Sequence, residues 1–113
     1  MEKKVLTVHI AEPWYSMIVS AKKMEEYRVI KPYWIKRLTT NCEVEYDVAL
    51  ERYCGKVLYR PYTHVLFING YRNDSTRIEK EIESITIGKP KKGLCPDKWL
   101  DKDFFLLLNS SSV

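Results

Sequence analysis

The sequence contains little of what the common catalytic motifs are built from. Its four glycines, at positions 55, 70, 88 and 93, complete neither a phosphate-binding loop nor a dinucleotide-binding fingerprint. Its three cysteines form no C-x-x-C pair, which disfavours both a disulfide framework and a zinc site. Segments of the G-x-S-x-G and H-E-x-x-H types are missing as well. These absences leave a serine or metal hydrolase without support, and we expect neither a metal nor a cofactor.

Long apolar runs are also missing. The longest, FFLLL (residues 104–108), has the length of a strand, whereas a membrane helix needs roughly 20 apolar residues. The first ten residues lack the apolar centre and the small-residue cleavage site of a signal peptide. We therefore expect a cytoplasmic protein that does not enter a membrane. Its cysteines are expected to be reduced and buried at Cys42, Cys54 and Cys95.

The composition is that of an ordinary globular chain. Of the 113 residues, 45% are hydrophobic and 30% are charged, and this length suits one core. We expect a single domain over residues 1–109 and a disordered tail over residues 110–113, where SSSV offers little to pack. The net charge of +4 permits a polyanionic partner but does not predict one, because the basic residues are spread along the chain.

Apolar periodicity predicts alternating strands and helices at the start of the chain and strands alone afterwards. A helix is expected to begin at Pro13, with Trp14, Met17, Ile18 and Ala21 on its buried face. A second is expected to begin at Pro32, with Trp34, Ile35 and Leu38 as its apolar side. Strands are expected over residues 4–11, 24–30, 64–71, 77–87 and 104–108. The last of these should be an inner strand that is buried on both faces. Residues 39–60 fit a strand and a helix alike. This order predicts an α+β fold, namely an open mixed β-barrel of five or six strands with two short helices near one end.

Aromatic residues stand beside basic ones at several points. This combination suits stacking on unpaired bases, since every base has a π-face and every nucleotide has a phosphate. Trp14 and Trp34 are better explained as core residues at helical spacing. Tyr33 and Tyr71 lie beside turn signals, so the sequence favours neither burial nor exposure for them.

The stretch AKKMEEYRVI (residues 21–30) gathers charged residues where a helix should run into a strand. Glu26 and Arg28 are two apart on the expected strand, so they point the same way and can pair. Tyr27 and Val29 take the other face, where we expect them to pack under the helices. An exposed ion pair of little energetic value is the alternative, and composition by itself favours it.

Two segments carry a resemblance to a known family. Residues 12–38 resemble the opening of ASCH-domain proteins, which belong to the PUA-like superfamily. In that family a helix ends in G-x-K-T and the next strand carries E-x-R; here the two motifs read AKKM (residues 21–24) and EYR (residues 26–28). Residues 65–77 and 83–90 resemble later barrel strands of small members, including an N-G-Y turn. The resemblance covers about half of the chain, and Ala21 and Met24 depart from the glycine and the threonine of the motif.

The resemblance implies a PUA-like barrel that binds RNA or nucleotides in a cavity beside Lys23, Glu26 and Arg28. The residues expected to contact the ligand are Trp14, Lys22, Lys23, Glu26, Arg28, Tyr33, Asn69, Tyr71 and Arg72. Some small members are amidohydrolases that act on acetylated cytidine, and another is a ribonuclease. Lys23 matches the amidohydrolase lysine, but Glu26 stands in the place of its threonine, so the candidate catalytic residues are Lys23 and Glu26. An RNA- or nucleotide-binding module, a nucleoside-processing hydrolase and an adaptor that binds protein through residues 39–60 all stay open.

Overall fold

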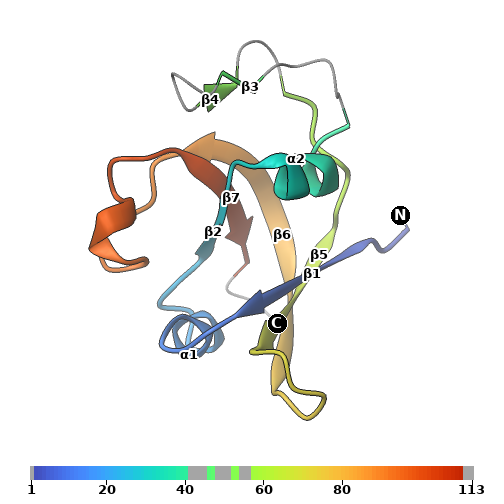
Figure 1. The fold of residues 1–113 in the computed structure, drawn as a ribbon. Coiled ribbons are helices and arrows are strands. Elements are labelled where there is room, and N and C mark those ends of the chain that lie inside the picture. Colours follow the sequence, from blue (N-terminus) through green and yellow to red (C-terminus); the bar gives the residue numbers. More distant parts are fainter. Residues whose placement is uncertain (1, 41–45, 48–51, 54–56, 111–113) are drawn as a thin grey trace. The chain divides into compact units, whose positions relative to one another are not determined.

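The computed structural model describes residues 2–40, 46–47, 52–53 and 57–110 (Figure 1). The elements follow one another as β1 (Val5–Ile10), α1 (Trp14–Val19), β2 (Glu25–Val29), α2 (Pro32–Leu38), β3 (Tyr46–Asp47), β4 (Arg52–Tyr53), β5 (His64–Asn69), β6 (Arg77–Gly88), the 3₁₀ helix η1 (Asp97–Trp99) and β7 (Phe104–Asn109). Helices and strands thus alternate at the start and strands dominate afterwards, which confirms the predicted α+β class.

Five strands form one mixed sheet in the order β1-β5-β6-β7-β2. β1 runs parallel to β5 and places Leu6 beside Val65, whereas β5 runs antiparallel to β6 and places Val65 beside Lys80. β3 and β4 form a separate antiparallel pair. The five-stranded sheet has β1 and β2 as its edges, so the strands that the structure describes are not closed into a barrel.

The chain divides into two compact units, each of which is described by itself. The first unit comprises the described residues of 1–26, 62–84 and 107–113, and the second comprises those of 27–61 and 85–106. Three strands, β2, β6 and β7, contribute residues to both units. A single domain over residues 1–109 stays a prediction, as does the disordered tail, of which residues 111–113 lie outside the described residues.

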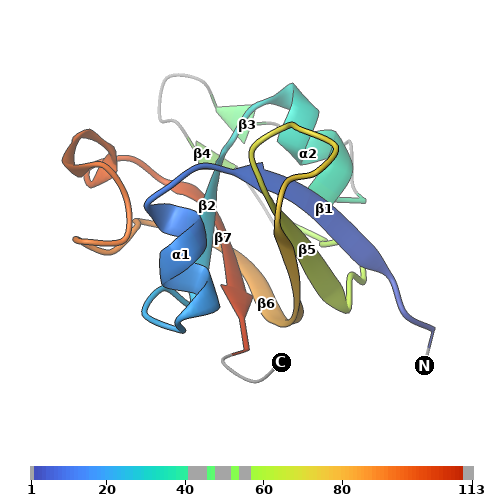
Figure 2. The ribbon, with the colours of Figure 1, turned by 90° about the horizontal axis from the view of Figure 1, so that it is seen from below.

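The core of the first unit follows from the alternation of β1. Leu6 and Val8 are buried while Thr7 between them is exposed, because successive side chains of a strand point to opposite faces. Val65 and Phe67 lie beside them on β5 and are fully buried. α1 follows directly from the end of β1 (Figure 2) and adds Ile18 to this core.

The buried face of α1 differs from the prediction. Tyr15 and Ile18 are buried, whereas Trp14 and Met17 are only half-buried. Ala21, expected on the same face, lies beyond the helix, since its positive φ of 64° belongs to the left-handed region, and the helix has only six residues. On the predicted apolar side of α2, Leu38 is fully buried, whereas Trp34 and Ile35 are half-buried.

The second unit has a small core of its own. Tyr27, Cys95 and Phe104 form it, and the partly buried hydrophobic residues packed against it are Leu94, Trp99, Leu100 and Leu106. Cys95 is a buried free thiol, as predicted; Cys42 and Cys54 lie outside the described residues. Phe104 and Phe105 are consecutive and both buried, and β7 has a neighbour on each side, so the prediction of an inner strand is confirmed.

Two further predictions concern the burial of Val29 and the secondary structure of residues 39–60. Val29 was predicted to pack with Tyr27, but it is 47% exposed whereas Tyr27 is 2% exposed. The physical reason is position: Val29 ends β2, which is an edge strand. In the ambiguous stretch 39–60, Tyr46–Asp47 and Arg52–Tyr53 are strands, so the helical interpretation is wrong at these residues.

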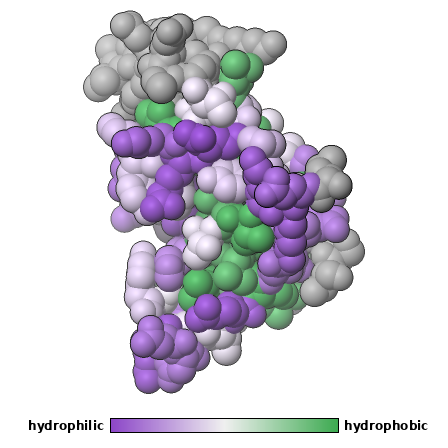
Figure 3. Space-filling view, turned by 90° about the vertical axis from the view of Figure 1, so that its right-hand side faces the viewer, coloured by the Kyte–Doolittle hydropathy of each residue, from purple (hydrophilic) through white to green (hydrophobic). Residues whose placement is uncertain are grey.

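The surface carries apolar as well as charged side chains. Figure 3 shows an apolar area of one face that is bordered by hydrophilic residues. Single exposed hydrophobic residues are normal on globular proteins. α1 and α2 have six and seven residues, and no helix among the described residues is long and apolar enough to cross a bilayer.

Candidate functional site

Lys23 and Glu26 form a buried ion pair in the first unit. Their side chains are 1% and 7% exposed, and 3.7 Å separates the Lys23 Nζ from the Glu26 Oε1. Lys23 is thus a partner of this carboxylate that the sequence did not predict, and the predicted pairing of Glu26 with Arg28 stays a prediction. Taking two charges out of water costs several kcal/mol per ion, and the attraction within a single ion pair offsets only part of this desolvation free energy. The stretch is therefore not solvated surface at these two residues.

The end of α1 positions Lys23. The Ala21 N–H donates to the Ile18 carbonyl (3.1 Å) and the Lys23 N–H donates to the Met17 carbonyl (3.0 Å). The left-handed backbone of Ala21 makes this reversal of the chain feasible. The Lys23 ammonium then lies over the ring of Trp14, 5.5 Å from its centroid. The ring of Trp14, a residue of α1, is thus in contact with the Lys23 ammonium. Such a cation–π contact attracts the ammonium to the face of the ring.

Lys80 and Asn109 are two buried polar residues that sequence reasoning missed. Each side chain belongs to a residue that is only 1% exposed. The backbone of Lys80 is paired with Val65 in the sheet, but its side chain makes no ion pair and no hydrogen bond with any residue that the structure describes. The Nδ2 of Asn109 is buried without a hydrogen-bond partner. A signal for Lys80 was present: it alternates with Ile78 and Ile82, so it occupies an apolar position of its strand.

Backbone hydrogen bonds link the three segments of the first unit that carry these four residues. The Asn109 N–H donates to the carbonyl of Met24 (2.8 Å), which follows Lys23. The next N–H, that of Ser110, donates to the carbonyl of Glu81 (2.8 Å), which follows Lys80. The end of β7 therefore links the segment of Lys23 and Glu26 to the segment of Lys80.

The turn after β5 presents the expected surface residues. Tyr71 is 85% exposed, and its ring stacks on that of His9 with centroids 4.5 Å apart and an interplanar angle of 9°. The Nδ1 of His9 donates to the Gly70 carbonyl (2.7 Å), which holds the imidazole under the tyrosine. Arg72 is exposed and pairs with Asp74 (3.1 Å). Tyr71 is thus an accessible flat surface beside a basic residue, and its side chain is ordered by the stack.

Asn69 has a structural partner. Its Nδ2 donates to the Glu12 carboxylate (3.4 Å), which also accepts hydrogen bonds from the hydroxyl (2.7 Å) and the N–H (2.9 Å) of Ser16. The bonds from Ser16, with a smaller contribution from Asn69, lower the pKa of Glu12 below its ordinary value of 4.5. Asn69 therefore links the turn after β5 to the first turn of α1.

The remaining residues expected to contact the ligand are Lys22, Arg28 and Tyr33. Lys22 is exposed. Arg28 belongs to the second unit, where its guanidinium lies 5.2 Å from the centroid of Trp34. Tyr33 belongs to the same unit, is 53% exposed and lies under Arg37, with 4.5 Å from the guanidinium to the ring centroid. A cavity shared by Lys23, Glu26 and Arg28 stays a prediction.

The buried polar side chains of Lys23, Glu26, Lys80 and Asn109 supply two ammonium groups, one carboxylate and one amide. Within the described ranges, no group of three or more His, Cys, Asp or Glu side chains could hold a metal ion. An ammonium or an amide N–H donates to phosphate and carbonyl oxygens, and a carboxylate accepts from amino or hydroxyl groups. Comparison with family models, with curated proteins and with solved structures finds no match for this chain.

Proposed function

We propose that this chain is a cytoplasmic RNA- or nucleotide-binding module of the ASCH type, built on a PUA-like barrel. Its ligand is expected to enter beside Trp14 and Lys23 and to reach the polar cluster of the first unit. The resemblance of residues 12–38 to the ASCH opening supports this proposal, and so does the burial of Lys23 and Glu26 in the part of the chain that carries the motif.

The observation that carries the proposal is an excess of buried donors. Among the described residues of the first unit, the buried charged side chains are those of Lys23, Lys80 and Glu26, and the amide of Asn109 adds a donor without an acceptor. Buried polar groups are nearly always hydrogen-bonded, since an unmet donor costs about 1–3 kcal/mol. A ligand with acceptor oxygens, such as a phosphate or a base carbonyl, would satisfy them.

Single-stranded RNA is the form of ligand that suits the surface residues. Tyr71 offers a stacking surface, and Lys22 and Arg72 offer exposed positive charge within the same unit. Stacking on an aromatic ring contributes about 1–3 kcal/mol per base. Paired bases cannot stack in this way, so we expect weaker binding of duplex RNA.

Fluorescence anisotropy with labelled single-stranded RNA tests the proposal. Affinity should fall with salt by a slope of about −0.7 per phosphate neutralised. Lys80→Met should weaken binding, while the folded state should keep or gain stability, because a buried charge is replaced by an apolar chain of similar length. Lys92→Met, at an exposed lysine of the second unit, is the matched control and should bind as the unchanged protein does. No affinity at low salt for single-stranded, hairpin or duplex RNA would remove the proposal.

A second function, hydrolysis of an acylated nucleoside, is favoured by the Lys23–Glu26 pair itself. A lysine held 3.7 Å from a carboxylate can pass a proton to it, and the neutral amine can then activate water. The amine would take a proton from water, and the resulting hydroxide would add to the acyl carbon of acetylated cytidine. The C–N bond would then break as the same proton passes from the ammonium to the leaving nitrogen, which releases cytidine and acetate. Chromatography of a panel of acylated nucleosides after incubation detects this turnover. Lys23→Met should abolish it; a panel without turnover would leave only the binding module.

A further inference from the structure

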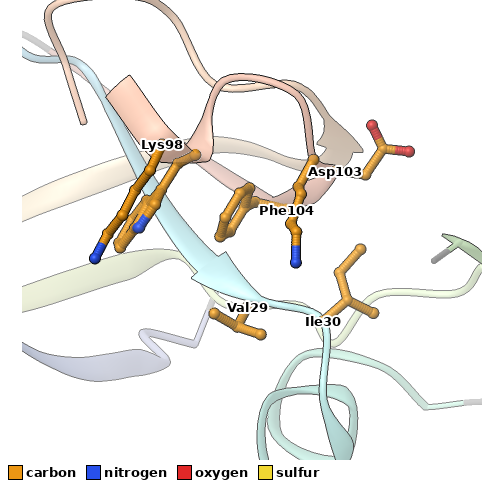
Figure 4. A pocket seen from close by; sticks show the side chains of 7 residues that line it. Val29, Ile30, Lys98, Asp103 and Phe104 are labelled. Atoms are coloured by element: carbon orange, nitrogen blue, oxygen red, sulfur yellow. The ribbon is translucent and has the colours of Figure 1, made fainter. Parts of the chain in front are cut away.

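The second unit contains a pocket whose lining residues all belong to that unit. It has a volume of about 430 Å³, within the range of roughly 300–1,000 Å³ that is usual for small-molecule sites. The residues that line it come from the end of β2 and from the segment between η1 and the start of β7, and they are Val29, Ile30, Lys98, Trp99, Lys102, Asp103 and Phe104. In Figure 4, Val29 and Ile30 lie on the opposite side of the pocket from Lys98 and Phe104.

One wall of this pocket is aromatic. The rings of Trp99 and Phe104 are stacked, with centroids 5.0 Å apart and an interplanar angle of 20°. Phe104 is only 4% exposed and Trp99 is half-buried, so the core holds the stack in place. Val29 is 47% exposed and faces this pocket from the other side. An apolar slot between flat and aliphatic walls suits a planar ring.

The polar groups of the pocket are mostly basic. Lys98 and Lys102 are exposed lining residues. Lys98 makes no ion pair with any side chain in the described part of the chain. The acidic lining residue, Asp103, is paired with Lys89 (3.4 Å), and Figure 4 shows its carboxylate turned away from Phe104. Its negative charge is thus offset, and the pocket has a net positive character that complements an anion.

We propose that this pocket binds a planar aromatic compound that carries an anionic group. The ring would lie between the Trp99–Phe104 stack and Val29, and the anion would be held by Lys98 and Lys102. This arrangement explains why an apolar residue of the edge strand β2 is left exposed. The proposal does not depend on RNA binding by the first unit, since none of its residues belongs to that unit.

Two probes test it, adenosine 5′-monophosphate and 2-naphthoate, in titrations followed by two-dimensional ¹H–¹⁵N NMR. The indole N–H signal of Trp99, assigned through its loss in Trp99→Phe, should shift with at least one probe. Adenosine lacks the anion and ribose 5-phosphate lacks the ring, so each should bind about tenfold or more weakly than the nucleotide. If neither aromatic anion moves the Trp99 signal, the proposal is wrong.

Variants then locate the binding. The double variant Lys98→Ala and Lys102→Ala should raise the Kd roughly tenfold, whereas Lys92→Ala, at an exposed lysine outside the pocket, should leave it unchanged. Val29→Trp should fill the slot and abolish the Trp99 shift without changing any charge, and exposure of Val29 leaves room for the change. A shift that persists in Val29→Trp would show that the probe binds elsewhere and would overturn the proposal.

Discussion

At the scale of single residues, the buried charges of the first unit set it apart from an ordinary core. Lys23, Glu26 and Lys80 are at most 6% exposed, although lysine and glutamate are rarely buried in proteins. A buried ion pair contributes little net stability, because desolvation offsets its attraction. The retention of such charges therefore agrees better with a functional role than with a structural one.

The Lys23–Glu26 pair makes a prediction about stability. Lys23→Met leaves the Glu26 carboxylate buried without this cation, so it should destabilise the fold by about 3 kcal/mol in urea denaturation. Adding Glu26→Leu should recover much of this loss, because both charges are then gone. Arg72→Ala removes an exposed pair with Asp74 and should cost less than about 1 kcal/mol. Equal effects of the buried and exposed changes would show that the buried pair is solvated in solution.

The pair of Lys3 and Glu79 makes a prediction about pH. The hydrogen bond and charge of Lys3, at 2.6 Å, lower the pKa of Glu79 below its ordinary value of 4.5. A carboxyl group whose pKa is lower in the folded state stabilises the fold above its unfolded pKa, and this contribution is lost as the pH falls through the folded pKa. Glu79→Gln should thus lower the Tm at neutral pH, and its difference from the unchanged protein should shrink below pH 4.5. Lys3→Met should reproduce this behaviour; a difference that is independent of pH would contradict it.

At the scale of elements, the two short helices depend on local signals at their ends. Pro32 opens α2 at a position where proline is tolerated, because its fixed φ suits the first turn. α1 has no side-chain cap at Pro13, but the Glu12 carboxylate accepts the N–H of Ser16 within the first turn. A hydrogen-bond acceptor one residue earlier thus replaces the usual cap.

The left-handed residue at the end of α1 leads to a prediction about stability. Ala21 adopts φ 64°, a conformation that costs a residue with a Cβ roughly 1 kcal/mol relative to glycine. Ala21→Gly should therefore stabilise the fold by up to about 1 kcal/mol, as measured by the urea midpoint at an unchanged slope. Ala11→Gly, at an exposed residue whose φ is not positive, is the control and should bring no gain. A loss of stability in Ala21→Gly would show that the left-handed turn is not formed.

At the scale of the whole molecule, the two units share strands. β2, β6 and β7 each pass from one unit into the other, so melting either unit removes hydrogen-bonding partners within these strands. This connection is the physical reason to expect one cooperative transition, as in most single domains of this size.

Tryptophan fluorescence tests this cooperativity, because Trp14 lies in the first unit and Trp99 in the second. One variant keeps only Trp14 and another keeps only Trp99, with phenylalanine at the other tryptophan positions. Their urea midpoints should coincide with each other and with the midpoint from circular dichroism of the same variant. Separate midpoints within one variant would contradict a single domain over residues 1–109.

The sequence by itself determined the class of the fold and the positions of most elements. Alternation in β1 and β5 and the prolines before α1 and α2 are local signals, and local signals suffice where one face of an element is buried. The resemblance to the ASCH opening, and not these signals, marked Lys23 and Glu26 as candidates. The prediction that Val29 is packed was wrong, because the periodicity of a strand does not reveal whether the strand lies at an edge.

Only the tertiary structure decided which charges are buried and which residues meet. Lys80 and Asn109 lie far from Lys23 in the sequence, and the hydrogen bonds of Asn109 and Ser110 bring their segments together. The Trp99 pocket likewise joins the end of β2 to residues about 70 positions later. Such contacts depend on strand order, which composition and spacing leave open, because the free energy that selects it comes from packing over the whole sheet.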